Sequence, residues 1–195
     1  MNNSSAAAQP YVPLRLAGRP LTLKLVAVAL GTLFLAASSW IEVPMFPVPM
    51  TMQTFAVTLI GALYGWRLGL ATVLAWLGEA ALGFPVLAGG AGGLAHFVGP
   101  TGGYLVAFPL AAMLVGWLAE RGWTGAGRIL SSVAAMLLGN AFILAFGGLW
   151  LAVVIGLADA IAFGVLPFIL GGALKAVLAT VTVEVYRRSG AKPAL

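Results

Sequence analysis

Long apolar runs are the feature that most constrains how this chain of 195 residues can fold. Short polar, glycine-containing or proline-containing segments separate the runs, which lie at residues 21–40, 51–64, 68–82, 104–118, 129–151 and 160–186. A helix needs about 20 apolar residues to cross the hydrocarbon core of a bilayer. Hydrophobic residues make up 62% of the chain and charged residues only 8%, whereas about 25% of a soluble domain is charged. We therefore predict an all-α integral membrane protein with six transmembrane helices.

Basic residues predict which side of the membrane each loop occupies, because cytoplasmic loops carry an excess of Lys and Arg. Glu42 and Asp159 fall in loops with no basic residue. With the N-terminus inside, six spans place nine of the ten basic residues in the cytoplasm, namely Arg15, Arg19, Lys24, Arg67, Arg121, Arg128, Arg187, Arg188 and Lys192. We predict cytoplasmic termini, with residues 1–20 as an N-terminal tail, 21–187 as the membrane domain and 188–195 as a C-terminal tail.

The composition also argues against other kinds of protein. The chain has no cysteine, which excludes disulfides and thiolate metal sites, and its single histidine, His96, has no acidic neighbour. We therefore expect no metal and no cofactor. Because the basic residues gather at helix ends, we expect the lipid bilayer as a partner and no nucleic acid. The first span ends in LAASSW, which is also typical of a signal-peptide cleavage region. The charge pattern favours a retained helix.

Two ionisable residues fall inside predicted spans. Lys175 lies twelve residues before Arg187, and Glu79 lies twelve residues after Arg67, so each is expected roughly 18 Å from the cytoplasmic end of its helix. Ionisable groups at that depth usually face an interior or a cavity. Either the two residues pair with each other and hold helices together, or Lys175 faces a cavity and meets an anionic substrate.

The stretch GGAGGLAHFVGPTGGY at residues 89–104 is unusually rich in glycine. No GxxxxGK[ST] motif is present, so a phosphate-binding loop is excluded. Glycine lets backbone approach a ligand closely, and irregular backbone at membrane depth is tolerated where it is buried or lines a cavity. The alternative is a solvated loop, yet residues 83–104 carry no Lys, Arg, Asp or Glu. We interpret the stretch as a cap that closes over a site.

Four segments resemble the signature segments of the BioY family. They are PVPMTMQTFAV (47–57), GFPVLAGGAGG (83–93), GPTGGYLVAFPLAAMLVGWLAER (99–121) and GVLPFILGGALKA (164–176). Members of that family are the membrane-embedded biotin-binding S subunits of energy-coupling-factor (ECF) transporters, so the resemblance implies a transport protein and no enzyme. It implies six helices, with biotin bound near the extracellular side under loops. The expected partners are a transmembrane T subunit and two ATPase subunits, in a prokaryotic inner membrane.

The resemblance also implies roles for individual residues. The closing motif of the family usually reads like PFLPGDLIK, whereas PFILGGALK here keeps Lys175 but has Gly172 in place of the Asp. Lys175 is then the partner of the valerate carboxylate of biotin, and Glu79 either orients Lys175 or keeps it charged while the site is empty. Gln53, Asn140 or backbone within the glycine stretch is expected to replace the Asp at the ureido ring. The expected contacts from the glycine-rich segments are Gly89, Gly90, Gly92, Gly93, Thr101, Gly102 and Gly103.

Aromatic residues at the predicted outer helix ends are candidate walls for the bicyclic ring of biotin. They are Trp40, Phe46, Phe84 and Tyr104, and the alternative for each is an interfacial anchor. Ala27 and Gly31 in the first span have the small-xxx-small spacing that allows close helix approach, and they are a candidate face for docking a partner subunit.

Three other functions fit parts of the sequence. The chain could be an S subunit for a different vitamin, as Gly172 suggests. It could be an intramembrane enzyme that uses Glu79 and His96 as an acid–base pair. It could also be an assembly subunit without a small-molecule ligand.

Overall fold

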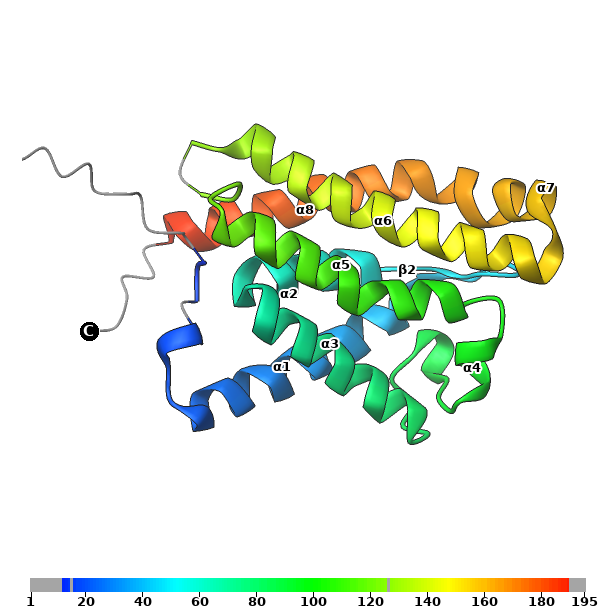
Figure 1. Ribbon diagram of the computed structural model, residues 1–195, viewed down its shortest axis with the longest axis horizontal. Coiled ribbons are helices and arrows are strands. Elements are labelled where there is room, and N and C mark those ends of the chain that lie inside the picture. Colours follow the sequence, from blue (N-terminus) through cyan, green and yellow to red (C-terminus); the bar gives the residue numbers. More distant parts are fainter. Residues whose placement is uncertain (1–11, 15, 126, 190–195) are drawn as a thin grey trace, which may run out of the picture.

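The computed structural model describes residues 12–14, 16–125 and 127–189, and shows an elongated bundle of helices (Figure 1). The longer helices are α1 (Leu21–Trp40), α2 (Gln53–Tyr64), α3 (Trp66–Ala81), α5 (Gly102–Glu120), α6 (Ile129–Ile155) and α8 (Leu166–Arg188). The shorter elements are the 3-10 turns η1 (Leu16–Gly18) and η2 (Ala88–Gly90), the strands β1 (Glu42–Val43) and β2 (Met50–Thr51), and the helices α4 (Ala95–Val98) and α7 (Leu157–Asp159). A π-helical segment, η3 (Ala160–Val165), joins α7 to α8.

The described helices differ in how well they match the thickness of a bilayer. Four helical stretches are long and apolar enough to cross it: α1, α5, α6 and the run from Leu157 to Arg188. The helix α2 has 12 residues and α3 has 16, or about 18 and 24 Å of helix against a core of about 30 Å. The six predicted helices are therefore present, but two of them are short and depend on adjoining irregular segments to complete their passage.

Both ends of the described chain lie at the same end of the bundle (Figure 1). The described residues among the predicted cytoplasmic cations all lie at helix ends that meet there, and we call it the basic end. Arg19 lies just before α1 and Lys24 in its first turn, Arg67 lies in the first turn of α3, and Arg187 and Arg188 end α8. The opposite end carries the hairpin, α4 and α7 (Figure 1). Arg15, Lys192 and most of the two predicted tails fall outside the described residues, and the cytoplasmic placement of the basic end stays a prediction.

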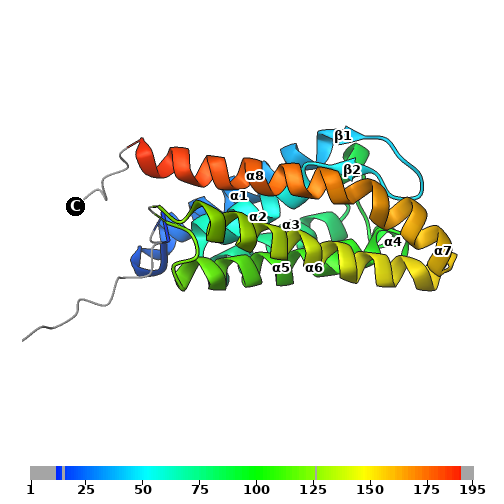
Figure 2. The same ribbon diagram turned by 90° about the horizontal axis from the view of Figure 1, so that it is seen from above.

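A proline-rich hairpin links α1 to α2. Glu42 pairs with Thr51 and Val43 with Met50, in antiparallel register. Three prolines at 44, 47 and 49 lie between the strands and cannot donate backbone hydrogen bonds, so this segment forms no helix, as its sequence predicts. Figure 2 shows the hairpin beside the first turns of α8, at the end away from the termini. Extended backbone thus completes the passage that the short α2 begins.

The helix α5 forms the centre of the bundle. It is the most buried of the long helices and packs against α2, α3 and α6. Small residues allow these contacts, because a Cβ added to Gly61 in α2 would lie 2.4 Å from the carbonyl oxygen of Ala112 in α5. Close backbone approach of this kind drives helix association in membranes, where burial of apolar surface supplies little energy.

The last helical run bends without breaking. A break at Pro167 is expected from sequence, but Pro167 occupies the first turn of α8, where a backbone N–H has no helical partner to lose. The π-helical turn of η3 lies just before it and absorbs the irregularity. Tyr104 of α5 fixes this turn, because its buried hydroxyl donates a 2.8 Å hydrogen bond to the carbonyl of Gly164.

The small-residue stripe of α1 faces the interior of the chain. A Cβ added to Gly31 would lie 2.5 Å from Cγ2 of Thr72 in α3, and Ala27 is buried. The hydroxyl of Tyr64 in α2 donates a 2.9 Å hydrogen bond to the carbonyl of Ala27. The expectation that Ala27 and Gly31 dock a partner subunit is therefore corrected, because α2 and α3 of the same chain already cover this face.

Candidate functional site

Two cavities meet in the half of the bundle away from the termini. The outer cavity has a volume of about 370 Å3 and lies between the hairpin, the segment connecting α3 to α5, and α5 itself. Its lining includes Pro47, Thr51, Gln53, Ala88, Ala91, Ala95, His96, Pro100, Thr101 and Phe108. Each cavity falls at the lower end of the volume range of small-molecule sites.

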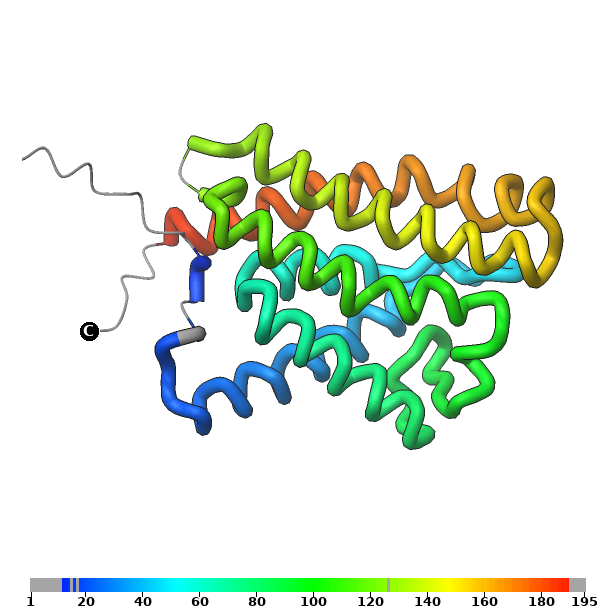
Figure 3. The backbone as a smooth tube through the Cα atoms, viewed as in Figure 1, coloured from blue at the N-terminus to red at the C-terminus, as the bar shows by residue number. Residues whose placement is uncertain are grey.

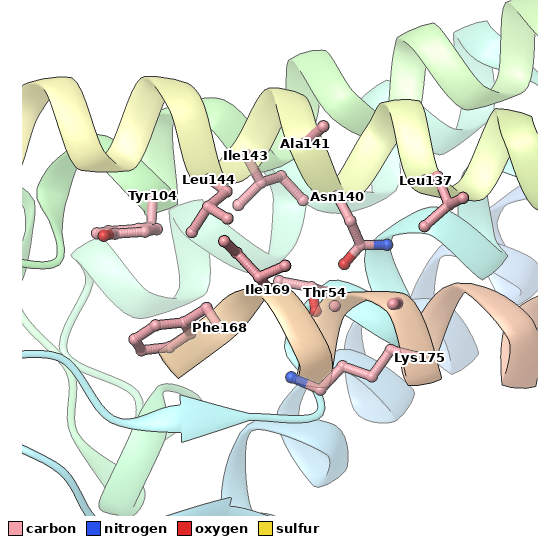
Figure 4. Close-up of a pocket in the computed structure, with 12 residues that line it drawn as sticks. Thr54, Tyr104, Leu137, Asn140, Ala141, Ile143, Leu144, Phe168, Ile169 and Lys175 are labelled. Carbon is pink, nitrogen blue, oxygen red and sulfur yellow. The ribbon is translucent and has the colours of Figure 1, made fainter. Parts of the chain in front are cut away.

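The second cavity, which we call the interhelical cavity, lies between α6 and α8 and has a volume of about 310 Å3 (Figure 4). Its walls are mostly apolar and include Leu137, Ile143, Leu144, Ile169 and Ala173, with Asn140 and Gly172 among them. Four residues line both cavities: Thr54, Tyr104, Phe168 and Lys175. The two spaces are therefore adjoining compartments of one site.

Lys175 lies at the junction of the two compartments. Its ammonium donates a 2.6 Å hydrogen bond to the carbonyl of Thr51 in β2, which links α8 to the hairpin. Among the residues that the structure describes, no other Lys, Arg, Asp or Glu side chain lines either cavity. An ammonium carries three donors, so the bond to Thr51 leaves two for a ligand. An acidic small molecule would find its counter-charge here.

Glu79 does not pair with Lys175. Glu79 lies near the C-terminal end of α3 and lines neither cavity. In the described part of the chain, the ion pairs join Glu184 to Arg187 and Arg188, and none involves Glu79. The helix α3 packs on α1, α2 and α5, whereas Lys175 belongs to α8, which packs on α2, α6 and η3. The expectation of a Glu79–Lys175 pair that holds helices together is therefore wrong for this structure.

Two hydroxyls of the outer cavity are already hydrogen-bonded. The hydroxyl of Thr51 donates a 2.9 Å hydrogen bond to Oε1 of Gln53, and that of Thr101 donates a 3.2 Å bond to the carbonyl of His96. In the interhelical cavity, Nδ2 of Asn140 donates a 2.9 Å bond to the carbonyl of Met136. Of the predicted binding residues, Lys175, Gln53, Asn140, Thr101 and Tyr104 are thus brought together at one site.

The segment between α3 and α5 folds into the end of the bundle, as the tube in Figure 3 shows for residues 82–101. Side chains from other elements anchor it. Ser39 and Trp76 donate hydrogen bonds of 2.7 and 3.1 Å to the carbonyl of Val86, and Trp150 donates one of 3.0 Å to that of Gly99. Leu87 is buried in the core. We call residues 82–101 the cap, and these contacts hold it against the rest of the bundle.

The predicted glycines Gly89, Gly90, Gly92 and Gly93 shape the cap and line neither cavity. Gly89, Gly90 and Gly93 have positive φ, which glycine adopts at no steric cost. A Cβ on Gly92 would lie 2.3 Å from the carbonyl oxygen of Phe84, so only glycine allows this fold of the chain onto itself. Gly102 and Gly103 pack against Trp150 of α6. The cap residues that line the outer cavity are Leu87, Ala88, Ala91, Ala95, His96, Gly99, Pro100 and Thr101.

Three of the four predicted aromatic walls lie outside the site. Trp40, Phe46 and Phe84 are 61%, 90% and 56% exposed and line neither cavity. Trp40 donates a 3.2 Å hydrogen bond to the carbonyl of Pro85, which anchors the base of the cap. Tyr104 is the one predicted wall in place, and Phe168 stands next to it with ring centroids 6.3 Å apart. Phe168 was missed although it lies within the closing motif.

Sequence reasoning also missed Thr54, which lines both compartments. Its hydroxyl oxygen is buried and has no hydrogen-bond partner, which is unusual because most buried polar side-chain atoms are paired. The signal was present, since Thr54 follows Gln53 directly in PVPMTMQTFAV. A serine or threonine early in a helix is common enough that this signal alone does not single out the residue.

The fold and the cavities define a class of protein: a membrane-spanning helical bundle with adjoining cavities of small-molecule size. Comparison with known proteins narrows the class. The family model described as the BioY family matches residues 5–192. The chain belongs to the BioY family, which confirms the resemblance seen in its motifs.

Individual relatives agree with this assignment. The chain is 40% identical over 165 residues to the probable biotin transporter BioY of Pyrococcus horikoshii, covering 83% of this chain and 96% of that protein. It is 41% identical over 145 residues to the biotin transporter BioY of Rhizobium etli, covering 71% and 78%. A crystal structure of the S-component for biotin from an ECF-type ABC transporter superposes with a TM-score of 0.74 at 30% identity, covering 87% of this chain and 93% of that one. The family consists of transporter components, which confirms that the chain is not an enzyme.

Proposed function

We propose that this protein is the biotin-binding S component of an ECF-type transporter, and that the two adjoining compartments hold biotin. The observation that carries the proposal is Lys175, because its ammonium meets both compartments and no other Lys, Arg, Asp or Glu lines them. Biotin combines a carboxylate on a flexible chain with a compact ring system. The half-buried Lys175 suits the carboxylate, and the rings of Tyr104 and Phe168 suit the apolar part of the molecule.

The cap supports capture from the side opposite the basic end. The excess of Lys and Arg in cytoplasmic loops makes the basic end cytoplasmic, so the cap and both cavities then face the extracellular side of a prokaryotic inner membrane. Biotin would enter where the cap meets the hairpin, and the cap would close over it. Transport would require a transmembrane T subunit and two ATPase subunits, because the sequence holds no phosphate-binding loop.

The first test is ligand binding by the purified chain in detergent. We expect isothermal titration calorimetry to show biotin binding that an excess of thiamin or riboflavin does not displace, and we expect no ATP hydrolysis. Binding of thiamin or riboflavin in place of biotin would instead support an S component for another vitamin. Absence of binding to all three, with folded protein, would contradict the proposed function.

The cap gives a separate prediction. Substitution Gly92→Ala places a Cβ against the backbone of Gly83 and Phe84, which cannot rotate away as a side chain can. We expect the cap to shift away from the outer cavity and biotin to dissociate at least about tenfold faster, since loss of closure acts mainly on the off-rate. Stopped-flow release of a fluorescent biotin derivative measures this rate. Leu94→Ala, which truncates an exposed side chain of the same segment, is the control and should leave the rate unchanged.

A further inference from the structure

A separate, smaller cavity lies at the basic end of the bundle (Figure 1), away from the two compartments. It has a volume of about 210 Å3 and lies where η1, α1, the junction of α2 with α3, and the end of α5 meet. Its lining residues are Leu16, Lys24, Tyr64, Arg67, Leu68 and Glu120. Sites for drug-sized molecules span about 300–1,000 Å3, so this cavity suits a small charged group rather than a whole cofactor.

The lining of this cavity has an excess of positive charge. Lys24 in α1 and Arg67 in α3 both line it, against the one carboxylate of Glu120. That carboxylate is already engaged, because its Oε1 accepts a 3.2 Å hydrogen bond from the backbone N–H of Trp66 at the start of α3. Among the described residues, the ion pairs join Glu184 to arginines of α8, and none involves Lys24 or Arg67. Two cations therefore line one small cavity without a carboxylate at ion-pair distance.

The position of Lys24 is unusual for a lysine near the end of a membrane helix. Such a side chain normally runs along the apolar surface and extends its ammonium into water. The neighbouring Leu23 and Leu25 are exposed, whereas Lys24 is half-buried and lines the same cavity as Arg67. Two cations that share a cavity repel each other. An anion bound between them would replace this repulsion with attraction.

The residues around the cavity fit the level of lipid headgroups. The guanidinium carbon of Arg67 lies 4.9 Å from the centroid of the Trp66 ring, in a cation–π contact. Tryptophan is enriched at the headgroup level of a bilayer, so this contact favours a position of Arg67 near the lipid phosphates. The exposed leucines of α1 on either side of Lys24 offer apolar surface to acyl chains.

We propose that this cavity binds the phosphate group of an anionic ligand, with the ammonium of Lys24 and the guanidinium of Arg67 donating hydrogen bonds to its oxygens. Arginine can donate two parallel bonds to a phosphate, and lysine adds a point charge. Basic cavities between membrane helices on the cytoplasmic side are typical sites for anionic lipid headgroups, and Trp66 and the exposed leucines favour a lipid over a soluble phosphate. A choline headgroup fits less well, because its own cation would face the same two side chains.

The test measures lipid binding by the detergent-purified chain, through native mass spectrometry and the unfolding temperature, which a ligand of the folded state raises. We expect phosphatidylglycerol to bind and to raise the unfolding temperature more than phosphatidylcholine does. In Lys24→Gln combined with Arg67→Gln, phosphatidylglycerol binding should weaken at least about tenfold, because both charged contacts are lost. Lys24→Arg keeps the charge and should bind like the wild type. Without added lipid, the double variant should unfold no earlier than the wild type, because it loses only mutual repulsion.

The matched control is Arg121→Gln combined with Arg188→Gln, which removes the same charge from the same end of the bundle at residues that do not line the cavity. It should keep the preference for phosphatidylglycerol. If both double variants lose that preference equally, general surface charge explains it and the assignment is wrong.

Inorganic phosphate distinguishes the two sources of the ligand. If phosphate alone raises the unfolding temperature of the wild type but not of the Lys24→Gln and Arg67→Gln double variant, and phosphatidylglycerol has no greater effect, the phosphate site is correct and its ligand is soluble. If the wild type responds to neither phosphate nor phosphatidylglycerol, the inference fails. None of these measurements uses biotin, so the inference can fail while the proposed function stands, and the reverse.

Discussion

Replacing Lys175 with alanine should weaken biotin binding about 30-fold, or about 2 kcal/mol, in calorimetry on detergent-purified protein. The magnitude follows from the loss of a hydrogen bond to a charged group, which is worth more than one between neutral groups. The variant Lys175→Met keeps the apolar stem of the side chain and should lose as much, because the ammonium is the group at issue. Lys24→Ala, which removes a lysine at the opposite end of the bundle, should bind like the wild type.

The structure also contains the competing explanation. Lys175 donates to the carbonyl of Thr51, so its role could be limited to tying α8 to the hairpin. In that case Lys175→Met would lower the unfolding temperature while folded protein kept its affinity. Equal biotin affinities for wild type and Lys175→Met would therefore refute the carboxylate assignment, whatever happens to stability.

The fold was predictable from the sequence to the extent that local chemistry determines it. Apolar runs fix where helices form, and the three prolines after Ile41 exclude a helix in the hairpin. The absence of Lys, Arg, Asp and Glu from residues 83–104 predicts a packed segment, and in the structure hydrogen bonds to the carbonyls of Val86 and Gly99 anchor it. The π-helical turn before Pro167 was not predictable, because it depends on Tyr104 reaching the carbonyl of Gly164 from another helix.

The site was less predictable, because it depends on which helices become neighbours. Depth along a helix suggested that Glu79 and Lys175 could meet, but depth says nothing about which face each helix turns to the other. For the same reason Trp40 and Phe84 were expected at the cavity and lie outside it. Ala27 and Gly31 have the spacing of a helix contact, and the sequence could not say whether the contact lies within the chain or with a partner.

How exposed each helix is suggests where partner subunits would dock. The helices α1 and α8 are the least buried of the long helices, whereas α5 is enclosed. Docking on α1 would use its outward face, with Leu30, Leu33 and Phe34 among its exposed side chains, and not the buried stripe.

The packing of α2 on α5 gives the largest effect expected on stability. Gly61 lies where α2, α3 and α5 converge: a Cβ there would be 2.4 Å from the carbonyl oxygen of Ala112, and Gly69 of α3 packs against the other side. Backbone atoms cannot rotate away as side chains do, so Gly61→Ala must separate α2 from α5. Overpacking of this kind costs about 1–3 kcal/mol, and we expect the upper end of that range.

Thermal unfolding in detergent, followed by intrinsic tryptophan fluorescence, measures the effect of Gly61→Ala. Gly78→Ala is the matched control, because a Cβ there meets nothing within 4 Å and alanine is the better helix former. It should unfold at the same temperature as the wild type or higher, whereas Gly61→Ala should unfold clearly earlier. Because α2 carries Thr54 and begins directly after the hairpin, Gly61→Ala should also weaken biotin binding in protein that remains folded. If Gly61→Ala were as stable as the wild type, α2 and α5 would not approach as closely as in this structure. The positions of the cavity-lining residues on both helices would then be wrong.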